Sequence, residues 1–533
     1  MIRNCLIQFV LGFCVVSSSF SATLVVDQGG GGDFTNLGAA IQAALANQEA
    51  DVIDIAPGTY FNVNEAGEVF AIAGEDELTL RGQDADNPPI ILIEPNLEET
   101  FLPENEIDGL IVQMAGSLRF ENLIFLPSEG FALEPDVFDL ITIVDHGTAD
   151  SPSTLDVTFD NVLITHGTLD NEPMTRTGWE DPREGANSTR ADAISLNARE
   201  PESTDGESGQ LTDTINLTLR NTVIAAHGAE VGHSIDYNVP NGTLTLLEGT
   251  RLTYPQNITV QNRAYAKTLV QGTEDNPVIL YYITGSRALN AWQNENEWEY
   301  MWVIGTLPEN TDLRFQGSQG AIRLETQAES LSARHCIFAN FFMSGIWGIY
   351  EFRSLGEIAS EGDFSDRTYL FEDCTFFNTP VAHQIGSDEP YDQPARAQII
   401  YRDCIFDTNQ IPPAGLLPIP QAALFSDQTA FLDHGGMLVP RDLNTQMTVE
   451  NLAYNAESVF SARSPNEDVL SSGNLIGDVD FGFQQTEWDP ERINDYLVPT
   501  NAQALSGQAS EGAALDGART ANFATGIDHW QLF

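Results

Sequence analysis

Two basic side chains stand close together in a strongly acidic chain. Arg263 lies four residues before Lys267, the only lysine among 533 residues that hold 78 Asp and Glu against 23 Lys and Arg. Such a pair could bind a carboxylate or stabilise an enolate-like intermediate. The alternative is an irregular segment from which both side chains reach solvent. A histidine could serve them as acid or base, and we select His227, although His-Gly pairs also suit structural turns; the four pairs begin at His146, His166, His227 and His434.

Aromatic residues follow shortly after this basic spot. The segment "NAWQNENEWEYMWVIG" (290–305) sets four rings among amides and carboxylates: Trp292, Trp298, Tyr300 and Trp302. Aromatic faces beside such polar groups suit the C–H faces of sugars. The same rings could instead pack on the wall of the fold. The sequence leaves both alternatives open.

Cys374, in "YLFEDCTFFN" (369–378), leads to an internal repeat. We define a coil unit of six residues: apolar, charged, Asn/Asp/His, small apolar, any residue, and aromatic or aliphatic. The unit occurs at 120–125, 159–164, 219–224, 333–338, 371–376, 401–406 and 449–454, with a degraded eighth copy, "VQNRAY", at 260–265. In that copy Arg263 takes the slot that Cys336, Cys374 and Cys404 fill elsewhere. We therefore interpret the cysteines as buried small hydrophobes, although neighbouring copies could lie close enough for a disulfide.

Apolar residues alternate before each copy, which is typical of a strand, and the alternation breaks at the third position. A strand that turns a corner there needs a residue that tolerates the left-handed conformation, as Asn, Asp and His do. The predicted corners are Asn122, Asn161, Asn221, His335, Asp373, Asp403 and Asn451. Strand, corner and strand, repeated with variable loops, predict a parallel β-solenoid.

The second position of the unit is charged in all seven clear copies and points outward by the alternation. If successive copies stack, Asp160 meets Arg220, and the later copies alternate in sign as Arg334, Glu372, Arg402 and Glu450. Opposite charges on neighbouring strands are mildly stabilising, so we expect a structural ladder rather than catalytic arginines.

The two ends of the chain complete the prediction. "GGGGDFTNLGAAIQAA…VIDIAPGTY", with "LTLRGQ" after it, resembles the N-terminal cap of secreted right-handed parallel β-helix proteins of the pectin-lyase-like superfamily, and "GNLIGDVDF" resembles their closing stretch. The resemblance implies an all-β, right-handed parallel β-helix over 23–533. Its N-terminal cap (23–62) would contain a short helix from about Leu37 to Ala46. Long insertions would fall within 165–330, and 465–533 would close the coil.

This fold hosts lyases, hydrolases, esterases, isomerases and adhesins, so the site must decide the activity. "RADAISLN" (190–197) resembles the aspartate-containing strand of polygalacturonase-type hydrolases, with Ala191 where that motif has its first aspartate. Asp192 is therefore a candidate catalytic carboxylate. The alternation places it on the side of Ile194 and Leu196 unless the chain bends first.

The amino-acid composition disfavours several classes of binding partner. A net charge of −55 disfavours nucleic acid, anionic lipid and, without a bridging cation, polyanionic sugars. Residues 1–22 have the form of a secretory signal peptide, which predicts export to the extracellular space or periplasm without a membrane anchor. Acidic loops such as "SDEPYDQ" (387–393) could hold calcium, although no loop has a dedicated calcium spacing.

The sequence thus predicts a secreted, carbohydrate-active β-helix that binds and cleaves an extracellular polysaccharide by β-elimination or hydrolysis. In a lyase, Arg263 or Lys267 would neutralise a uronate carboxylate and His227 would remove the proton. Two alternatives stand beside it: a glycoside hydrolase using Asp192, and a non-catalytic adhesin.

Overall fold

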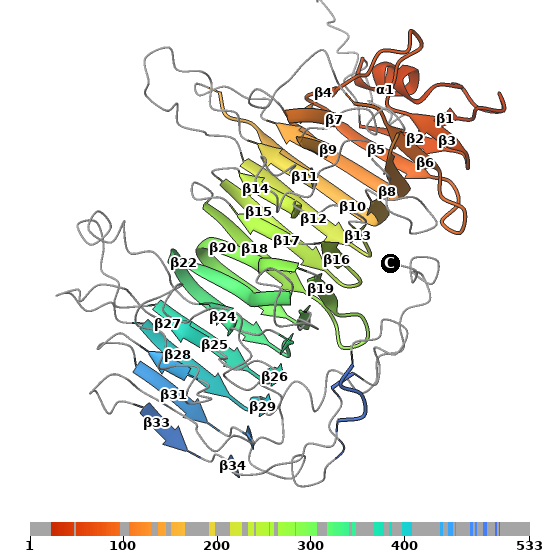
Figure 1. Ribbon diagram of the computed structural model, residues 1–533. Helices are drawn as coiled ribbons and strands as arrows, with labels where there is room; N and C mark the ends of the chain where they lie inside the picture. Colours follow the sequence, from red (N-terminus) through yellow and green to blue (C-terminus); the bar gives the residue numbers. More distant parts are fainter. Residues whose placement is uncertain are drawn as a thin grey trace, which may run out of the picture.

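The computed structural model shows a parallel β-helix capped by one short helix (Figure 1). It describes residues 23–46, 50–95, 106–128, 137–144, 151–165, 191–197, 214–225, 233–238, 241–254, 256–260, 265–282, 284–305, 317–340, 344–347, 367–377, 383–385, 397–407, 438–440, 446–450, 453–454, 469–472, 475–476, 483–487, 496–497 and 500. Within these ranges the named strands pair in parallel, each with its counterpart one coil away. The predicted fold class is confirmed. A right-handed coil is the usual sense for parallel strands joined by crossovers.

Each complete coil visits three faces of the solenoid, which we name A, B and C. Face A consists of β1 (Thr23–Val26), β2 (Asp51–Ile55), β5 (Glu77–Gly82), the first parts of β8 (Gly116–Pro127) and β10 (Thr154–Thr165), β12 (Thr214–Arg220), β15 (Asn241–Leu247), β18 (Tyr265–Gln271), the last parts of β20 (Thr284–Glu299) and β22 (Gly317–Arg334), β25 (Arg367–Glu372), β28 (Ala397–Arg402), β31 (Gln446–Glu450) and β33 (Val469–Ser472).

Face B follows face A across a sharp corner. It consists of β3 (Thr59–Phe61), β6 (Ile90–Ile93), the last parts of β8 and β10, β13 (Val223–Ala225), β16 (Arg251–Tyr254), β19 (Val278–Tyr282), β21 (Met301–Ile304), β23 (Ile337–Ala339), β26 (Thr375–Phe377), β29 (Ile405–Asp407), β32 (Ala453–Tyr454) and β34 (Leu475–Ile476).

Face C closes the coil. It consists of β4 (Ile72–Gly74), β7 (Glu106–Met114), β9 (Val137–Val144), β11 (Ala191–Asn197), β14 (His233–Asn238), β17 (Gln256–Val260), the first parts of β20 and β22, β24 (Ser344–Trp347), β27 (His383–Ile385) and β30 (Leu438–Pro440).

The corners between faces A and B lie where the coil unit predicts them. Positive φ angles of 45–56° occur at Asn122, Asn161, Asn221, His335, Asp373 and Asp403. These six corners are confirmed, and Asn451 lies outside the described residues. Two further corners escape the unit because their residue types differ: Gly249 has φ 73° and Tyr300 has φ 49°.

The prediction of a degraded eighth copy of the coil unit at 260–265 is wrong. Val260 ends β17 and pairs with Tyr237 on face C, whereas Tyr265 begins β18 and pairs with Asn241 on face A. The two ends of the segment therefore belong to faces C and A, and not to faces A and B as the coil unit requires. Arg263 lies outside the described residues.

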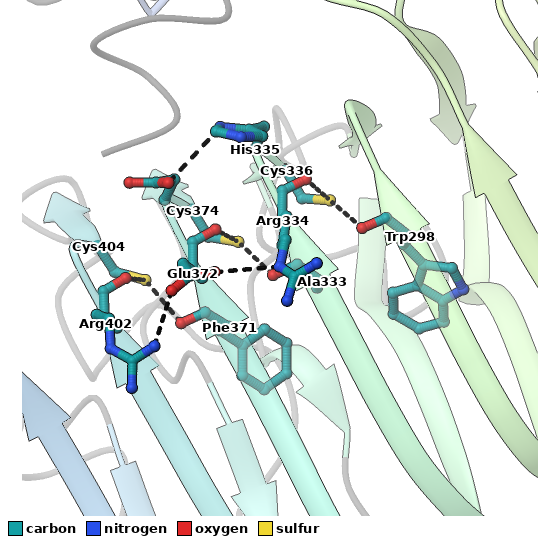
Figure 2. A network of polar contacts seen from close by, with 11 residues as sticks. Trp298, Ala333, Arg334, His335, Cys336, Phe371, Glu372, Cys374, Arg402 and Cys404 are labelled. Carbon is teal, nitrogen blue, oxygen red and sulfur yellow. Dashed lines mark hydrogen bonds and ion pairs between the residues drawn. The ribbon is translucent and has the colours of Figure 1, made fainter. Parts of the chain in front are cut away.

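Cys336, Cys374 and Cys404 each fill the inward slot directly after a corner, and all three are buried and free (Figure 2). The Cys374 sulfur lies 3.4 Å from the carbonyl of Glu372 and 3.5 Å from that of Ala333 on the preceding coil. Thr222 occupies the same slot, and its hydroxyl donates to the carbonyls of Arg220 at 2.9 Å and Phe159 at 3.1 Å. The thiols thus pack and hydrogen-bond as the threonine does.

The outward charges form the expected ladder on face A. Asp160 pairs in register with Arg220, and Arg334, Glu372, Arg402 and Glu450 follow one another. Glu372 lies 3.1 Å from Arg334 and 2.8 Å from Arg402 (Figure 2). These contacts confirm a structural role for the two arginines.

The cap also matches its prediction. Helix α1 (Leu37–Leu45) begins at the N-cap Asn36, whose side chain accepts a hydrogen bond from the amide of Ala39. Its buried face, including Ala40 and Ile41, joins the core beneath the first coils. An apolar helix over the first strands covers backbone edges that would otherwise be open to pairing.

A segment near the C-terminus covers the middle of the solenoid. Tyr496 and Leu497 are fully buried on the outer side of face B, beside Trp302 and Phe377. The Phe483 ring lies 5.5 Å from that of Phe377. Residues 483–487 and 496–497, here named the C-terminal strap, therefore pack against strands that precede them by more than a hundred residues.

Candidate functional site

Strands β9, β11 and β14 are neighbours on face C (Figure 1). Buried polar side chains gather on these three strands. Asp192 pairs in register with Asp139 on one side, and the pairing of Ile194 with Ile235 sets it opposite His233 on the other. Ser195 pairs with Asp236 in the adjoining row. All of them are at least nine-tenths buried.

The cluster lies on the outer side of the sheet. Ile235 and Tyr237 belong to the interior core, so Asp236 between them points outward. Ala193 and Ile194 are consecutive core residues, so β11 breaks its alternation there. This is the bend that frees Asp192 from the inward side, and Leu140 and Ile141 show the same break on β9.

Asp192 and His233 form the central contact. One carboxylate oxygen, Oδ1, accepts a hydrogen bond from the backbone amide of His233 at 2.7 Å and lies 3.0 Å from its ring Nδ1. A ring that donates from Nδ1 leaves Nε2 as the proton-accepting nitrogen, so the carboxylate fixes both the tautomer and the orientation. Two N–H donors on one oxygen suit an ionised carboxylate.

The same residues could hold a metal ion. Asp192, His233 and Asp236 each offer one ligand atom, and these atoms lie within 4.8 Å of one another. An imidazole nitrogen with two carboxylates suits a divalent transition metal better than calcium, which prefers oxygen alone. The calcium loop considered at 387–393 lies outside the described residues.

The predicted basic site is not assembled among the described residues. Lys267 stands on β18 of face A, where its Nζ lies 3.1 Å from Glu297 in an exposed ion pair. Face A is a different side of the solenoid from the Asp192 cluster. Arg263 and His227 lie outside the described residues, so their predicted roles stay predictions.

The predicted aromatic platform separates in the same way. Trp298 lies in the interior core and Trp302 lies under the C-terminal strap, each 1% exposed. Tyr300 turns the corner between them and stacks on His335 with ring centroids 4.6 Å apart. Burial leaves Trp298 and Trp302 no accessible ring face for a sugar. Tyr300 is partly exposed, so its predicted role stays a prediction, and the Trp292 side chain is outside the described part.

The sequence singled out Asp192 but missed His233, Asp236 and Asp139. A signal exists: "AISL" (193–196) and "SIDY" (234–237) share alternating apolar residues, and each follows a polar side chain. Stacking these two stretches on one face brings Asp192 and His233 together.

The comparisons with known proteins add the following. No family model and no curated protein matches the chain. A solved structure, described as a mannuronic acid specific polysaccharide family 6 lyase enzyme from human gut microbiota, aligns with a TM-score of 0.37 and 12% identity, over 87% of this chain and 92% of that one. The parallel strand pairing defines the fold class. The described residues contain no helix long and apolar enough to cross a bilayer.

Proposed function

We propose that this protein is a secreted hydrolase of an extracellular polysaccharide, with its chemical centre at Asp192, His233 and Asp236 on face C. The observation that carries the proposal is the close, buried, outward-facing cluster of two carboxylates and an imidazole. Glycosidic bonds are commonly hydrolysed by paired carboxyl groups, one ionised and one that donates a proton.

Each side chain has a role in this proposal. Asp192, held by two N–H groups of His233, is the ionised carboxylate that activates water or attacks the sugar. Asp236 protonates the leaving oxygen. His233 positions Asp192 through its ring and its backbone amide.

Hydrolysis is favoured over β-elimination by the charges of this site. Elimination beside a uronate needs a cation to neutralise the carboxylate, but the cluster supplies carboxylates, and Lys267 is on face A. The net charge of −55 also repels a polyuronate, which makes a neutral polysaccharide the proposed substrate.

The test is an incubation of the purified protein with a panel of neutral and acidic polysaccharides. We expect reducing ends to appear without absorbance from unsaturated uronates. Release of unsaturated products would establish a lyase instead. Binding without any cleavage would support the adhesin that the sequence leaves open.

A further inference from the structure

The Asp192 cluster has the geometry of a ligand set around a single ion. Its three ligand atoms come from two adjacent strands, β11 and β14, and lie within 4.8 Å of one another. The closest measured pair, Asp192 Oδ1 and His233 Nδ1, is 3.0 Å apart. Around a metal with bonds of about 2.1 Å, ligand atoms at right angles are about 3 Å apart, so this pair already has the spacing of a coordination edge.

Parallel strand pairing holds the set in place. Asp192 and His233 stand opposite each other, and the His233 amide anchors the Asp192 carboxylate at 2.7 Å. Asp236 follows three residues later on the same strand as His233, fixed outward by its core neighbours Ile235 and Tyr237. The side chains of Asp192 and His233 are only 4% and 9% exposed, so an ion there would lose most of its water.

The donor types define the class of ion. One nitrogen and two carboxylate oxygens suit borderline divalent metals such as zinc, cobalt or manganese, whereas calcium and magnesium prefer oxygen ligands. Two carboxylates would offset the charge of a divalent cation in a buried setting, where an unbalanced charge is costly.

We propose that Asp192, His233 and Asp236 bind one divalent transition-metal ion. The Nδ1 atom then coordinates the metal instead of donating to Asp192, and the ring takes its other neutral tautomer, in which Nε2 carries the proton. This inference rests on the proposed function because it concerns the same centre: Asp192 and Asp236 cannot act on a sugar while they coordinate an ion, so the bound metal should inhibit hydrolysis. Its test does not depend on cleavage, since binding is measured without any polysaccharide.

The experiment is a titration of the full-length protein, stripped with chelator, with cobalt(II) alone. A few hundred millimolar salt screens diffuse binding by the acidic surface. We expect one site with visible d–d absorption and a stoichiometry of one by calorimetry. Asp236→Asn and His233→Gln, which keep size nearly constant, should each weaken this site by about 100-fold or more.

Asp160→Asn is the matched control, because it removes one carboxylate from the face A ladder. It should leave cobalt affinity unchanged. Circular dichroism of each variant confirms that the β-helix is intact. The inference is overturned if no stoichiometric site appears, if both cluster variants keep full affinity, or if calcium displaces cobalt at equal concentration. In the chelator-stripped parent protein, polysaccharide cleavage without a stoichiometric cobalt site would overturn the inference alone, and a cobalt site without any cleavage would overturn the proposed function alone.

Discussion

Asp192 and His233 face each other on two neighbouring parallel strands. The Oδ1 atom of Asp192 accepts a hydrogen bond from the backbone amide of His233 and lies 3.0 Å from its ring Nδ1. This contact fixes two side chains on the outside of a solenoid whose interior is mainly apolar. Asp192 is therefore both a hydrogen-bond acceptor that stabilises the fold and a candidate catalytic carboxylate.

Removing that acceptor should destabilise the fold. Asp192→Ala leaves the buried His233 amide without this acceptor, a loss that costs about 1–3 kcal/mol. Asp192→Asn keeps a carbonyl oxygen there and should cost less. Denaturant midpoints of the two variants measure the difference, and equal midpoints would contradict a structural role for the contact.

The cysteine ladder should be chemically inert in the folded protein. Burial raises the pKa of the Cys374 thiol well above its ordinary value, so the thiol stays protonated at neutral pH. Mass spectrometry after alkylation at pH 8 should find Cys336, Cys374 and Cys404 unmodified in the native protein and modified in denaturant. Rapid native labelling of any of the three would refute the buried ladder.

Glu372 should stabilise the protein in a pH-dependent way. The hydrogen bond from Arg402, aided by Arg334, holds the pKa of this carboxyl below its ordinary value of 4.5. The stabilisation is therefore fully present above pH 4.5 and is lost as pH falls through the lowered pKa. Glu372→Gln should be less stable than the parent at pH 7, by less than about 1 kcal/mol for a partly exposed pair. The gap should close in acid, and a gap that widens there would refute the ladder.

The C-terminal strap should add stability to the middle coils. Tyr496 is fully buried against the outer side of face B, with its hydroxyl near Asn340. Tyr496→Ala should therefore cost about 3 kcal/mol or more, as other large core truncations do. Phe61→Ala is the control, because Phe61 is 40% exposed. Hydrogen exchange should show faster opening of β21 and β23 in the Tyr496 variant alone.

The sequence predicts the repeating parts of this protein well and the site poorly, for a physical reason. A corner such as Asn161 or Asp373 must tolerate positive φ, so its residue type is constrained in every coil. The site depends on the register between β11 and β14, which are one coil apart and have β12 and β13 between them in the chain. Alternation alone also cannot assign a strand to a face. For this reason the coil unit wrongly predicts a corner between faces A and B at 260–265, whose ends lie on faces C and A.

The proposed hydrolysis requires Asp236 and Asp192 on face C. The most direct measurement is the rate of reducing-end release by Asp236→Asn, compared with Lys267→Ala as a control on face A. We predict a loss of about 10²- to 10⁴-fold for Asp236→Asn and an unchanged rate for Lys267→Ala. Full activity in Asp236→Asn together with loss of activity in Lys267→Ala would contradict this assignment. It would indicate that the basic residues Arg263 and Lys267 carry the catalysis instead.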